Sequence, residues 1–459
     1  MSEYKLTVGL EVHAELKTLT KMFCNSKNDT DETRPNVNIC PVCMGHPGTL
    51  PVINKDAVRS VLRFGVAVGG ELADYTEFDR KNYFYPDIPK GYQISQYKHP
   101  LVRGGELAGV ALTRVHLEED TAKSTHQGDY SLIDFNRAGV PLMELVTEPV
   151  INSPEEAGNF ARELQLLLRY LGISEANMEK GEMRVEANIS VSKDKTLGTK
   201  VEVKNLNSFK VVEKAIKHEF DRQVALLERG ERVVQETRGW DDNKSETFSQ
   251  RLKEESHDYR YFPDPDLPKI SIQNEPSLSL EVLRSSLPEL PSEKRERYKR
   301  DFGIGDAHID IYVRSGDWGK YFEEVAKILN DKELNQLASN YITSDLKSQV
   351  DLNDFTEVVR MVSVGELSSR GAKEILKLLE AGEVGSKKLA EKNGLIQKSD
   401  EEELKKIVEE VIRENKSVVE DYKKGKEASL QFLVGQSMKA MNGGGNPVVL
   451  KKLLTELLS

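Results

Sequence analysis

Strict alternation of apolar and polar residues restricts the start of this chain to β-structure. In residues 8–16, "VGLEVHAEL", the positions between the apolar residues are filled by Glu11, His13 and Glu15. Side chains of a strand point to its two faces in turn, so this segment predicts a strand with one polar and one apolar face. The same alternation in residues 184–192 and 200–204 predicts two further strands of this kind.

Two amphipathic helices accompany these strands. After Ser153, a residue type that caps helix N-termini, leucines recur at helical spacing up to Gly172, and residues 209–230 repeat the pattern. The resulting order of strand, helix, strand, strand and helix contains no regular βαβ repeat. We therefore predict an α+β fold with an antiparallel sheet and flanking helices.

The sequence pattern changes near residue 290. In "SSLPELPSEKRERYKR" two prolines precede a run of charges, and beyond it the apolar spacing is almost wholly helical. At about 150 residues for each domain, the length of the chain corresponds to roughly three domains. We predict units at residues 1–290, 291–396 and 397–459, of which the second and third are all-helical.

Charge and hydropathy exclude some classes of protein. The 65 Lys and Arg residues against 76 Asp and Glu residues argue against a general nucleic-acid coat, because such coats are cationic. From Lys423 onwards, however, six lysines accompany two glutamates, which suits either solvated helix faces or an RNA-contacting tip. The sequence contains no run of 18 apolar residues and no signal peptide, so we expect a soluble cytoplasmic protein with no membrane partner.

The polar face of the first strand suits a metal ion. Carboxylate oxygens and a neutral imidazole are ligands for divalent cations, which makes Glu11 and His13 candidates for a metal site. The alternative is a sheet face that contacts only water, as in many antiparallel sheets.

Residues 79–148 add an acidic triplet and two lysines in segments with little periodicity. Glu118, Glu119 and Asp120 follow one another, and such a cluster is costly unless a divalent cation or an arginine lies beside it. A solvated turn is the alternative for the triplet. Lys81 and Lys90 flank an aromatic turn and are suited to phosphate oxygens, although ordinary surface lysines also fit this pattern. The chain has neither a P-loop nor a Rossmann fingerprint.

The three cysteines are clustered within 20 residues of sequence. Cys24 precedes the pair Cys40 and Cys43, a spacing that suits tetrahedral zinc, but structural zinc requires four ligands. His46 is the nearest candidate for the fourth ligand. So few cysteines argue against a disulfide scaffold and fit a reducing compartment.

Several long segments, in this order, resemble the B subunit of the tRNA-dependent amidotransferases. The matching segments include "GLEVHAELKT", "FDRKNYFYPDIPKGYQISQY", "HLEEDTAKSTH", "DFNRAGVPLMELVTEP", "MEKGEMRVEANIS", "KVEVKNLNSF" and "DYRYFPDPDLP". The resemblance implies a cradle-shaped α+β catalytic domain, a helical domain and a small tail domain that contacts tRNA. It also implies a heterotrimer in which the partners are the amidase (the A chain of the enzyme) and a small third chain (the C chain).

The resemblance further implies a ligase reaction. ATP phosphorylates the side-chain carboxylate of Glu-tRNA(Gln) or Asp-tRNA(Asn), and ammonia from the amidase partner then displaces the phosphate to give the amide. The cofactors implied are ATP and Mg²⁺.

The resemblance also assigns residues to this reaction. The positions that match the family's magnesium site are Glu11, His13, Glu118 and Glu119. We extend the catalytic site to Lys81 and Lys90, as contacts to the ATP phosphates or to a channel, and to Glu186 on the second polar strand. One departure concerns zinc, because Ser26 stands where many members have a further cysteine ligand.

Two other functions remain open from the residues alone. A non-catalytic RNA-binding scaffold would use the basic tail and leave the polar strands solvated. A metal-dependent nuclease would use the clustered carboxylates to hold two metal ions. We expect no DNA partner.

Overall fold

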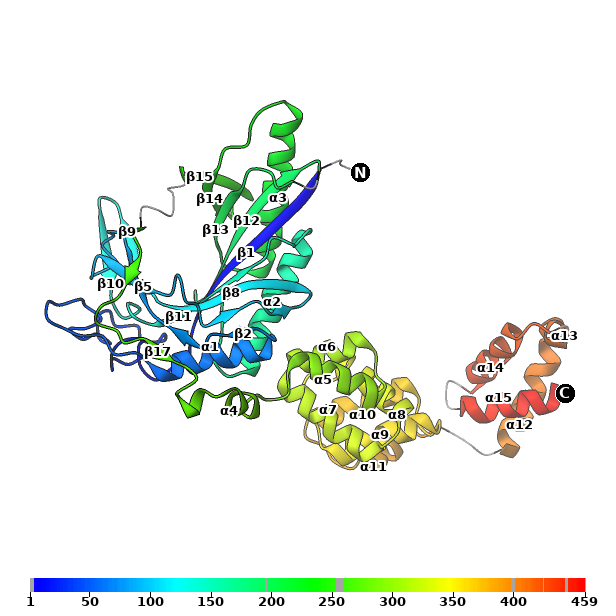
Figure 1. Ribbon diagram of the computed structural model, residues 1–459. Helices are drawn as coiled ribbons and strands as arrows, with labels where there is room; N and C mark the ends of the chain where they lie inside the picture. Colours follow the sequence, from blue (N-terminus) through cyan, green and yellow to red (C-terminus); the bar gives the residue numbers. More distant parts are fainter. Residues whose placement is uncertain are drawn as a thin grey trace. The chain divides into compact units, whose positions relative to one another are not determined.

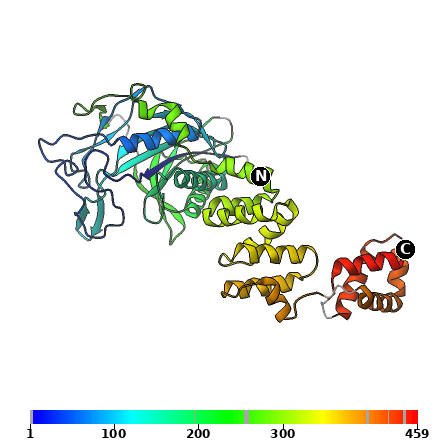
Figure 2. The ribbon, with the colours of Figure 1, turned by 90° about the horizontal axis from the view of Figure 1, so that it is seen from below.

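The computed structural model describes residues 4–194, 196–252, 259–397, 401–423, 425–441 and 445–458 (Figures 1 and 2). The chain forms two compact units, Met1–Leu290 and Pro291–Ser459. Over the described residues, no helix has the length and apolar composition that crossing a membrane requires.

A ten-stranded sheet forms the centre of the first unit. Its strand order is β15-β14-β13-β12-β1-β11-β8-β6-β2, and β7 pairs with β8. Its strands are β1 (Lys5–Glu15), β2 (Glu71–Leu72), β6 (Val102–Arg103), β7 (Glu106–Leu107), β8 (Val110–Glu119), β11 (Pro141–Thr147), β12 (Met183–Ser192), β13 (Val201–Leu206), β14 (Glu236–Asp241) and β15 (Glu246–Leu252). All pairs are antiparallel except β13 with β14, which is parallel.

Three smaller sheets complete the β-structure of this unit. They consist of β16 (Phe262–Pro263), β4 (Asp79–Asn82) and β5 (Tyr92–Ser95); β9 (Lys123–Gln127) and β10 (Tyr130–Asp134); and β3 (Tyr75–Thr76) and β17 (Ile270–Ser271). The segment around residues 262–271 therefore returns to pair with strands that lie almost 200 residues earlier in the chain.

Helices cover the apolar face of the large sheet. The helices of this unit are α1 (Lys55–Ala67), α2 (Pro154–Tyr170), α3 (Phe209–Glu228), the short 3₁₀-helix η2 (Pro276–Leu278) and α4 (Leu280–Ser285). The apolar positions of β1 are buried in one core with residues of α1, α2 and α3, and Figure 1 shows α2 and α3 beside the sheet. The predicted α+β fold is thus confirmed.

The start of α2 shows how local sequence sets these elements. Ser153 Oγ accepts a hydrogen bond from the backbone N–H of Glu156 at 3.1 Å, and the Glu156 carboxylate accepts one from the N–H of Asn152 at 2.9 Å. Backbone N–H groups of the first helical turn otherwise lack partners, so this exchange fixes where the helix begins. The predicted N-cap is confirmed.

The regular elements that the structure describes in the second unit are all helices, joined by turns and loops. The helices are α5 (Pro291–Arg297), the π-helix η3 (Tyr298–Phe302), α6 (Asp306–Arg314), α7 (Gly316–Leu329), α8 (Lys332–Ser344), α9 (Leu352–Ser363), α10 (Ser369–Glu380), α11 (Ser386–Lys392), α12 (Glu401–Glu414), α13 (Lys416–Lys423), α14 (Ala428–Ala440) and α15 (Pro447–Leu458). Helices α12 to α15 share a core of their own, as expected for a separate all-helical tail. The division near residue 396 stays a prediction.

Candidate active site on the polar face of the sheet

Strand register brings polar side chains from four strands to one sheet face. In β1, His13 lies opposite Glu144 of β11, and Glu144 lies opposite His116 of β8. In the next row of this face, Glu11 lies opposite Glu186 of β12. Since side chains two residues apart share a face, these five residues point to the side of the sheet opposite the apolar core.

Glu144 is the centre of the resulting cluster. Its Oε2 lies 3.4 Å from His13 Nε2 and 3.4 Å from His116 Nε2. At the edges of the cluster, Glu11 Oε1 is 3.9 Å from His13 Nε2, and Glu118 Oε1 is 3.6 Å from His116 Nε2. The predicted residues Glu11, His13 and Glu118 are therefore brought together, with Glu144 between them.

These side chains form two potential cation sites that share Glu144. The first consists of Glu11, His13 and Glu144 and the second of His116, Glu118 and Glu144; in each, one ligand atom per residue lies within 4.8 Å of the others. Each site offers carboxylate oxygens and one imidazole nitrogen, which fits a divalent cation. The side chain of Glu11 is 28% exposed, so water or a phosphate can complete the coordination from this side.

The pKa values of two histidines and one glutamate in the cluster are raised, whereas those of Glu118 and Glu144, despite burial, are lowered by the adjoining cationic groups. Burial alone would lower the pKa of each imidazole, but the adjoining carboxylates, above all Glu144, raise the pKa of both His13 and His116 to about 9. Burial, with repulsion from Glu144 and Glu186, raises the pKa of Glu11 to about 7. Since a cation binds the deprotonated forms, its binding would release protons.

Glu118 is held by hydrogen bonds from the small sheet that contains β5. Its carboxylate accepts hydrogen bonds from Ser95 Oγ at 2.6 Å and from Gln93 Nε2 at 2.9 Å. Both donors belong to β5, so the strand pair β4–β5 positions this carboxylate.

The other two acids of the triplet have different partners. Glu119 directly follows Glu118 and therefore faces the opposite side of the strand. Glu119 accepts hydrogen bonds from Lys90 Nζ at 2.6 Å and from the Ile94 backbone N–H at 2.9 Å, and it is not a member of either cation site. Asp120 pairs with Arg184 at 3.0 Å, so an arginine does accompany the triplet. The sequence-based grouping of Glu119 with the magnesium ligands therefore has no counterpart in this geometry.

Lys81 supplies a positive charge beside the cluster. Burial opposes this charge, but the carboxylates of Glu118 and Glu144 outweigh burial and raise the pKa of Lys81 well above its usual value. Its Nζ lies 5.1 Å from the centroid of the Tyr259 ring and 5.9 Å from that of Tyr83. Lys90, by contrast, is already paired with Glu119.

Glu186 belongs to a neighbouring acidic group with its own counter-charge. Oxygen atoms of Glu11, Glu186 and Glu202 lie within 4.8 Å of one another. Lys204 Nζ is 2.7 Å from Glu186 Oε2 and 3.8 Å from Glu202 Oε1. An ammonium group thus already neutralises part of this cluster.

Sequence reasoning did not single out His116 and Glu144 as site residues. A usable signal was present for Glu144, because it is the one charged residue in the buried run "PLMELVT" of β11. A charge within a buried strand requires a partner.

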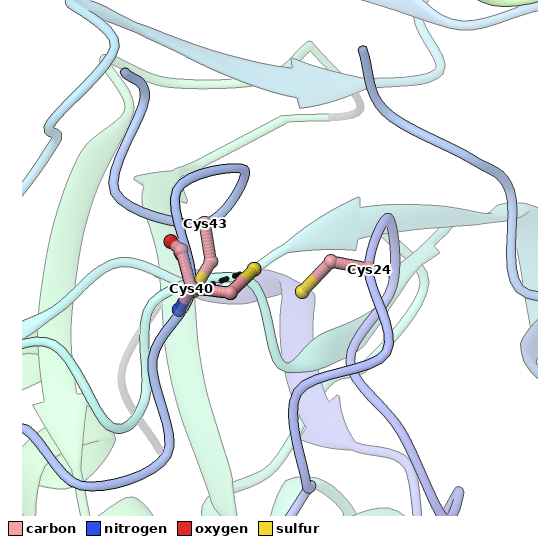
Figure 3. A group of neighbouring side chains, drawn as sticks. All are labelled: Cys24, Cys40 and Cys43. Carbon is pink, nitrogen blue, oxygen red and sulfur yellow. Dashed lines mark hydrogen bonds between the residues drawn. The ribbon is translucent and has the colours of Figure 1, made fainter. Parts of the chain in front are cut away.

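The predicted zinc site is incomplete. Sulfur atoms of Cys24, Cys40 and Cys43 lie within 4.8 Å of one another (Figure 3), and His46 is not a member of this group. At the position of the missing ligand, Ser26 Oγ lies 3.8 Å from Cys43 Sγ. Three thiols and a hydroxyl do not fit the four-ligand geometry of a structural zinc.

Comparison with known proteins places this chain in a family. Residues 6–277 match the family model described as "GatB/GatE catalytic domain", and residues 319–458 match the "GatB domain". The chain is 41% identical to the B subunit of the aspartyl/glutamyl-tRNA(Asn/Gln) amidotransferase from Carboxydothermus hydrogenoformans, over the whole of both chains. It is 42% identical to the protein of the same name from Thermotoga maritima over 99% of each chain.

This chain belongs to the GatB family. It is therefore one component of an amidotransferase, a ligase-type enzyme. All members of the cation sites, with Lys81 and Lys90, lie within the part that matches the GatB/GatE catalytic domain.

Proposed function

We propose that this GatB chain uses ATP and Mg²⁺ to activate the side-chain carboxylate of Glu-tRNA(Gln), Asp-tRNA(Asn) or both. Ammonia from an amidase partner then converts the activated group to the amide, and a small third chain completes a cytoplasmic heterotrimer. The names of the relatives support the class of substrate, and the chemistry of the polar sheet face supports the activation step.

A carboxylate must be activated because oxide is a very poor leaving group. A carboxylate oxygen attacks the γ-phosphorus of ATP, and the bond from that phosphorus to the bridging oxygen breaks to release ADP. Ammonia next attacks the carbonyl carbon of the acyl phosphate, phosphate leaves with the electron pair of the C–O bond, and a proton is lost from nitrogen.

The residues of the cluster would have different roles in this reaction. Glu11, Glu118 and Glu144 would hold the cation, with His13 and His116 as nitrogen ligands or as donors to the carboxylates. When bound, Mg²⁺ neutralises the phosphate charge and orients the transferring group. Lys81 adds a fixed positive charge beside the carboxylates, which favours the binding of phosphate oxygens.

One observation carries this proposal most directly. Carboxylates from three strands, Glu11, Glu144 and Glu118, converge on a face that also presents the Lys81 ammonium group. Phosphoryl transfer depends mainly on positioning and on neutralising charge, which this combination provides. Glu186 lies on this face, and the Lys90–Glu119 pair lies next to Glu118; we include these three residues as ones that shape the site. In the second unit, we propose that the tail at residues 397–459 contacts tRNA.

The test uses the complex reconstituted from this chain, the amidase and the small third chain. We expect Glu11→Gln to reduce amide formation on mischarged tRNA roughly 100-fold or more, because a cation ligand is lost. Glutaminase activity of the amidase remains measurable in the same sample, and co-elution of the three chains in gel filtration reports an assembled complex. Glu71→Gln, on exposed strand β2 of the same sheet, is the matched control and should retain full activity.

Three results would contradict the proposal. Unaltered amidation by the Glu11→Gln complex would remove this carboxylate from the activation step. Cleavage of the tRNA in place of amidation would indicate a nuclease, and binding of tRNA without ADP formation would indicate a scaffold.

A further inference from the structure

Because the three cysteines do not fit a structural zinc site, their clustering requires another explanation. Cys24 and the pair Cys40 and Cys43 lie on two loops that meet beside the large sheet (Figure 3). Cys43 Sγ is 3.9 Å from Cys40 Sγ, within the range of a sulfur–sulfur hydrogen bond. Two residues separate these cysteines, the spacing of dithiol motifs that exchange with disulfides.

Cys43 is placed to act as the resolving nucleophile of this pair, which attacks Cys40 once Cys40 is oxidised. Its sulfur accepts a hydrogen bond from the Cys40 backbone N–H at 3.1 Å, and Lys21 Nζ lies 3.7 Å away. Lys21 is fully buried, so its positive charge acts on the sulfur with little screening by water. Donors and a nearby ammonium group stabilise negative charge on sulfur, which is the attacking form in thiol chemistry.

The thiols of Cys40 and Cys43 differ in their exposure to solvent. Cys43 is only 4% exposed, whereas Cys40 is partly exposed. A small oxidant therefore reaches Cys40 more easily, while Cys43 lies behind it and faces its sulfur. This is the arrangement of an oxidisable thiol with an adjoining resolving thiol.

We propose that Cys40 and Cys43 form a reversible disulfide, with a hydroperoxide as the oxidant. The Cys40 sulfur attacks the peroxide oxygen, the O–O bond breaks, and Cys40 becomes a sulfenic acid as the peroxide is reduced to an alcohol or water. The Cys43 sulfur then attacks the Cys40 sulfur, and water leaves as the S–S bond forms. A dithiol reductant reverses the step by thiol–disulfide exchange.

The disulfide would act on the candidate active site through a direct contact. A side-chain Cβ at Gly45, two residues after Cys43, would lie 2.7 Å from Lys90 Cγ and 3.2 Å from the Lys90 backbone nitrogen, so the loop lies tightly against Lys90. Lys90 in turn pairs with Glu119, and one cavity of about 220 Å³ is lined by residues that include Cys24, Cys43, Lys90 and Glu119. A change in the Cys40–Cys43 loop would therefore shift the Lys90–Glu119 pair; its effect on activity rests on the proposed function.

The first experiment maps thiols and requires no activity. The purified full-length chain is treated with hydrogen peroxide or with dithiothreitol, alkylated, digested and analysed by mass spectrometry. We expect a peroxide-dependent peptide linked through Cys40 and Cys43 that disappears after dithiothreitol treatment, while Cys24 remains alkylated. The matched variant Cys24→Ser should retain the link, and Cys40→Ser should lose it.

Several results of this mapping would overturn the proposal. They are full alkylation of all three thiols after peroxide, a link through Cys24 in place of Cys40, or oxidation of Cys40 that dithiothreitol does not reverse. Stoichiometric zinc in a metal analysis of the purified chain would overturn it as well. Because wild-type protein alone gives these results, the test holds even if a variant fails to fold.

The second experiment measures the coupling to activity in the reconstituted complex. The ratio of amidation rates before and after peroxide should change several-fold in the wild-type complex and return with dithiothreitol. In the Cys40→Ser complex this ratio should stay near one. A wild-type ratio of one, with the disulfide demonstrated by mass spectrometry, would refute the coupling through Lys90 and leave the proposed amidotransferase function standing.

Discussion

Replacing Glu144 by glutamine tests the electrostatic description of the polar sheet face. At an effective dielectric constant near 20, a carboxylate 3.4 Å from an imidazolium attracts it by about 5 kcal/mol, and desolvation offsets much of this. Removing one partner of a buried ion pair costs roughly 3–5 kcal/mol. We expect Glu144→Gln to lower the free energy of unfolding of the first unit by about this amount at pH 7.

The dependence of this loss on pH follows from the two histidines. A folded-state pKa of about 9, against 6.5 in the unfolded chain, corresponds to roughly 3 kcal/mol for each of His13 and His116. Because these pKa values are raised, the stabilisation is fully present below pH 6.5 and is lost as the pH rises through 9. The difference between wild type and variant should therefore be largest near pH 6 and shrink towards pH 10.

The assay can isolate the first unit. The chain has two tryptophans, Trp240 in the first unit and Trp318 in the second, so a Trp318→Phe background leaves Trp240 fluorescence as the reporter. Denaturant unfolding is measured with EDTA present, so that bound cations do not contribute. The control is Glu148→Gln, which neutralises an exposed carboxylate just after the same strand and should change the unfolding free energy by less than about 0.5 kcal/mol. A Glu144→Gln variant as stable as this control at pH 6 would refute the reasoning.

Two further predictions concern packing and capping. Gly65→Ala in α1 should lower the free energy of unfolding by about 1–2 kcal/mol in thermal unfolding, because the new Cβ would lie 2.5 Å from Val102 Cγ2 and the cost of overpacking exceeds the gain in helix propensity. Gly435→Ala in α14 has open space around the new Cβ and should instead raise the free energy of unfolding. Equal changes in stability for the two variants would contradict this explanation. Asp354→Asn should cost about 1–2 kcal/mol in the second unit, because the Asp354 carboxylate accepts hydrogen bonds from the N–H groups of Gly385 and Ser386 at the start of α11. These hydrogen bonds lower the pKa of Asp354, although burial opposes them. The greater stability of the wild type over Asp354→Asn should therefore be present above the unfolded pKa of about 3.8 and fade as the pH falls further. A stability difference between the two proteins that stays constant down to pH 2 would exclude this cause.

Local sequence was sufficient for the elements and for part of the candidate site. Alternation with a period of two identified β1 and β12, and the cap at Ser153 located α2, because these signals depend only on residues next to one another in the chain. The polar face of β1 likewise indicated Glu11 and His13. Such patterns indicate which face of a helix or strand a residue occupies, and this does not depend on which residues pack against it.

The partners of these residues depended on strand register. Glu144 enters the site because β11 pairs with β1 at His13 and with β8 at His116, so residues distant in the sequence become neighbours across the sheet. The same geometry separates Glu118 from Glu119, although they are adjacent in sequence.

The sequence by itself therefore determined the family, the α+β class and the chemistry of the polar strand face, since each is encoded in residue order and spacing. Tertiary structure alone decided that Glu144 joins two cation sites, that Glu119 pairs with Lys90, and that Lys21 lies against Cys43. The physical reason is that charges and sulfur atoms interact over a few ångströms, and only the folded sheet and its loops set those distances.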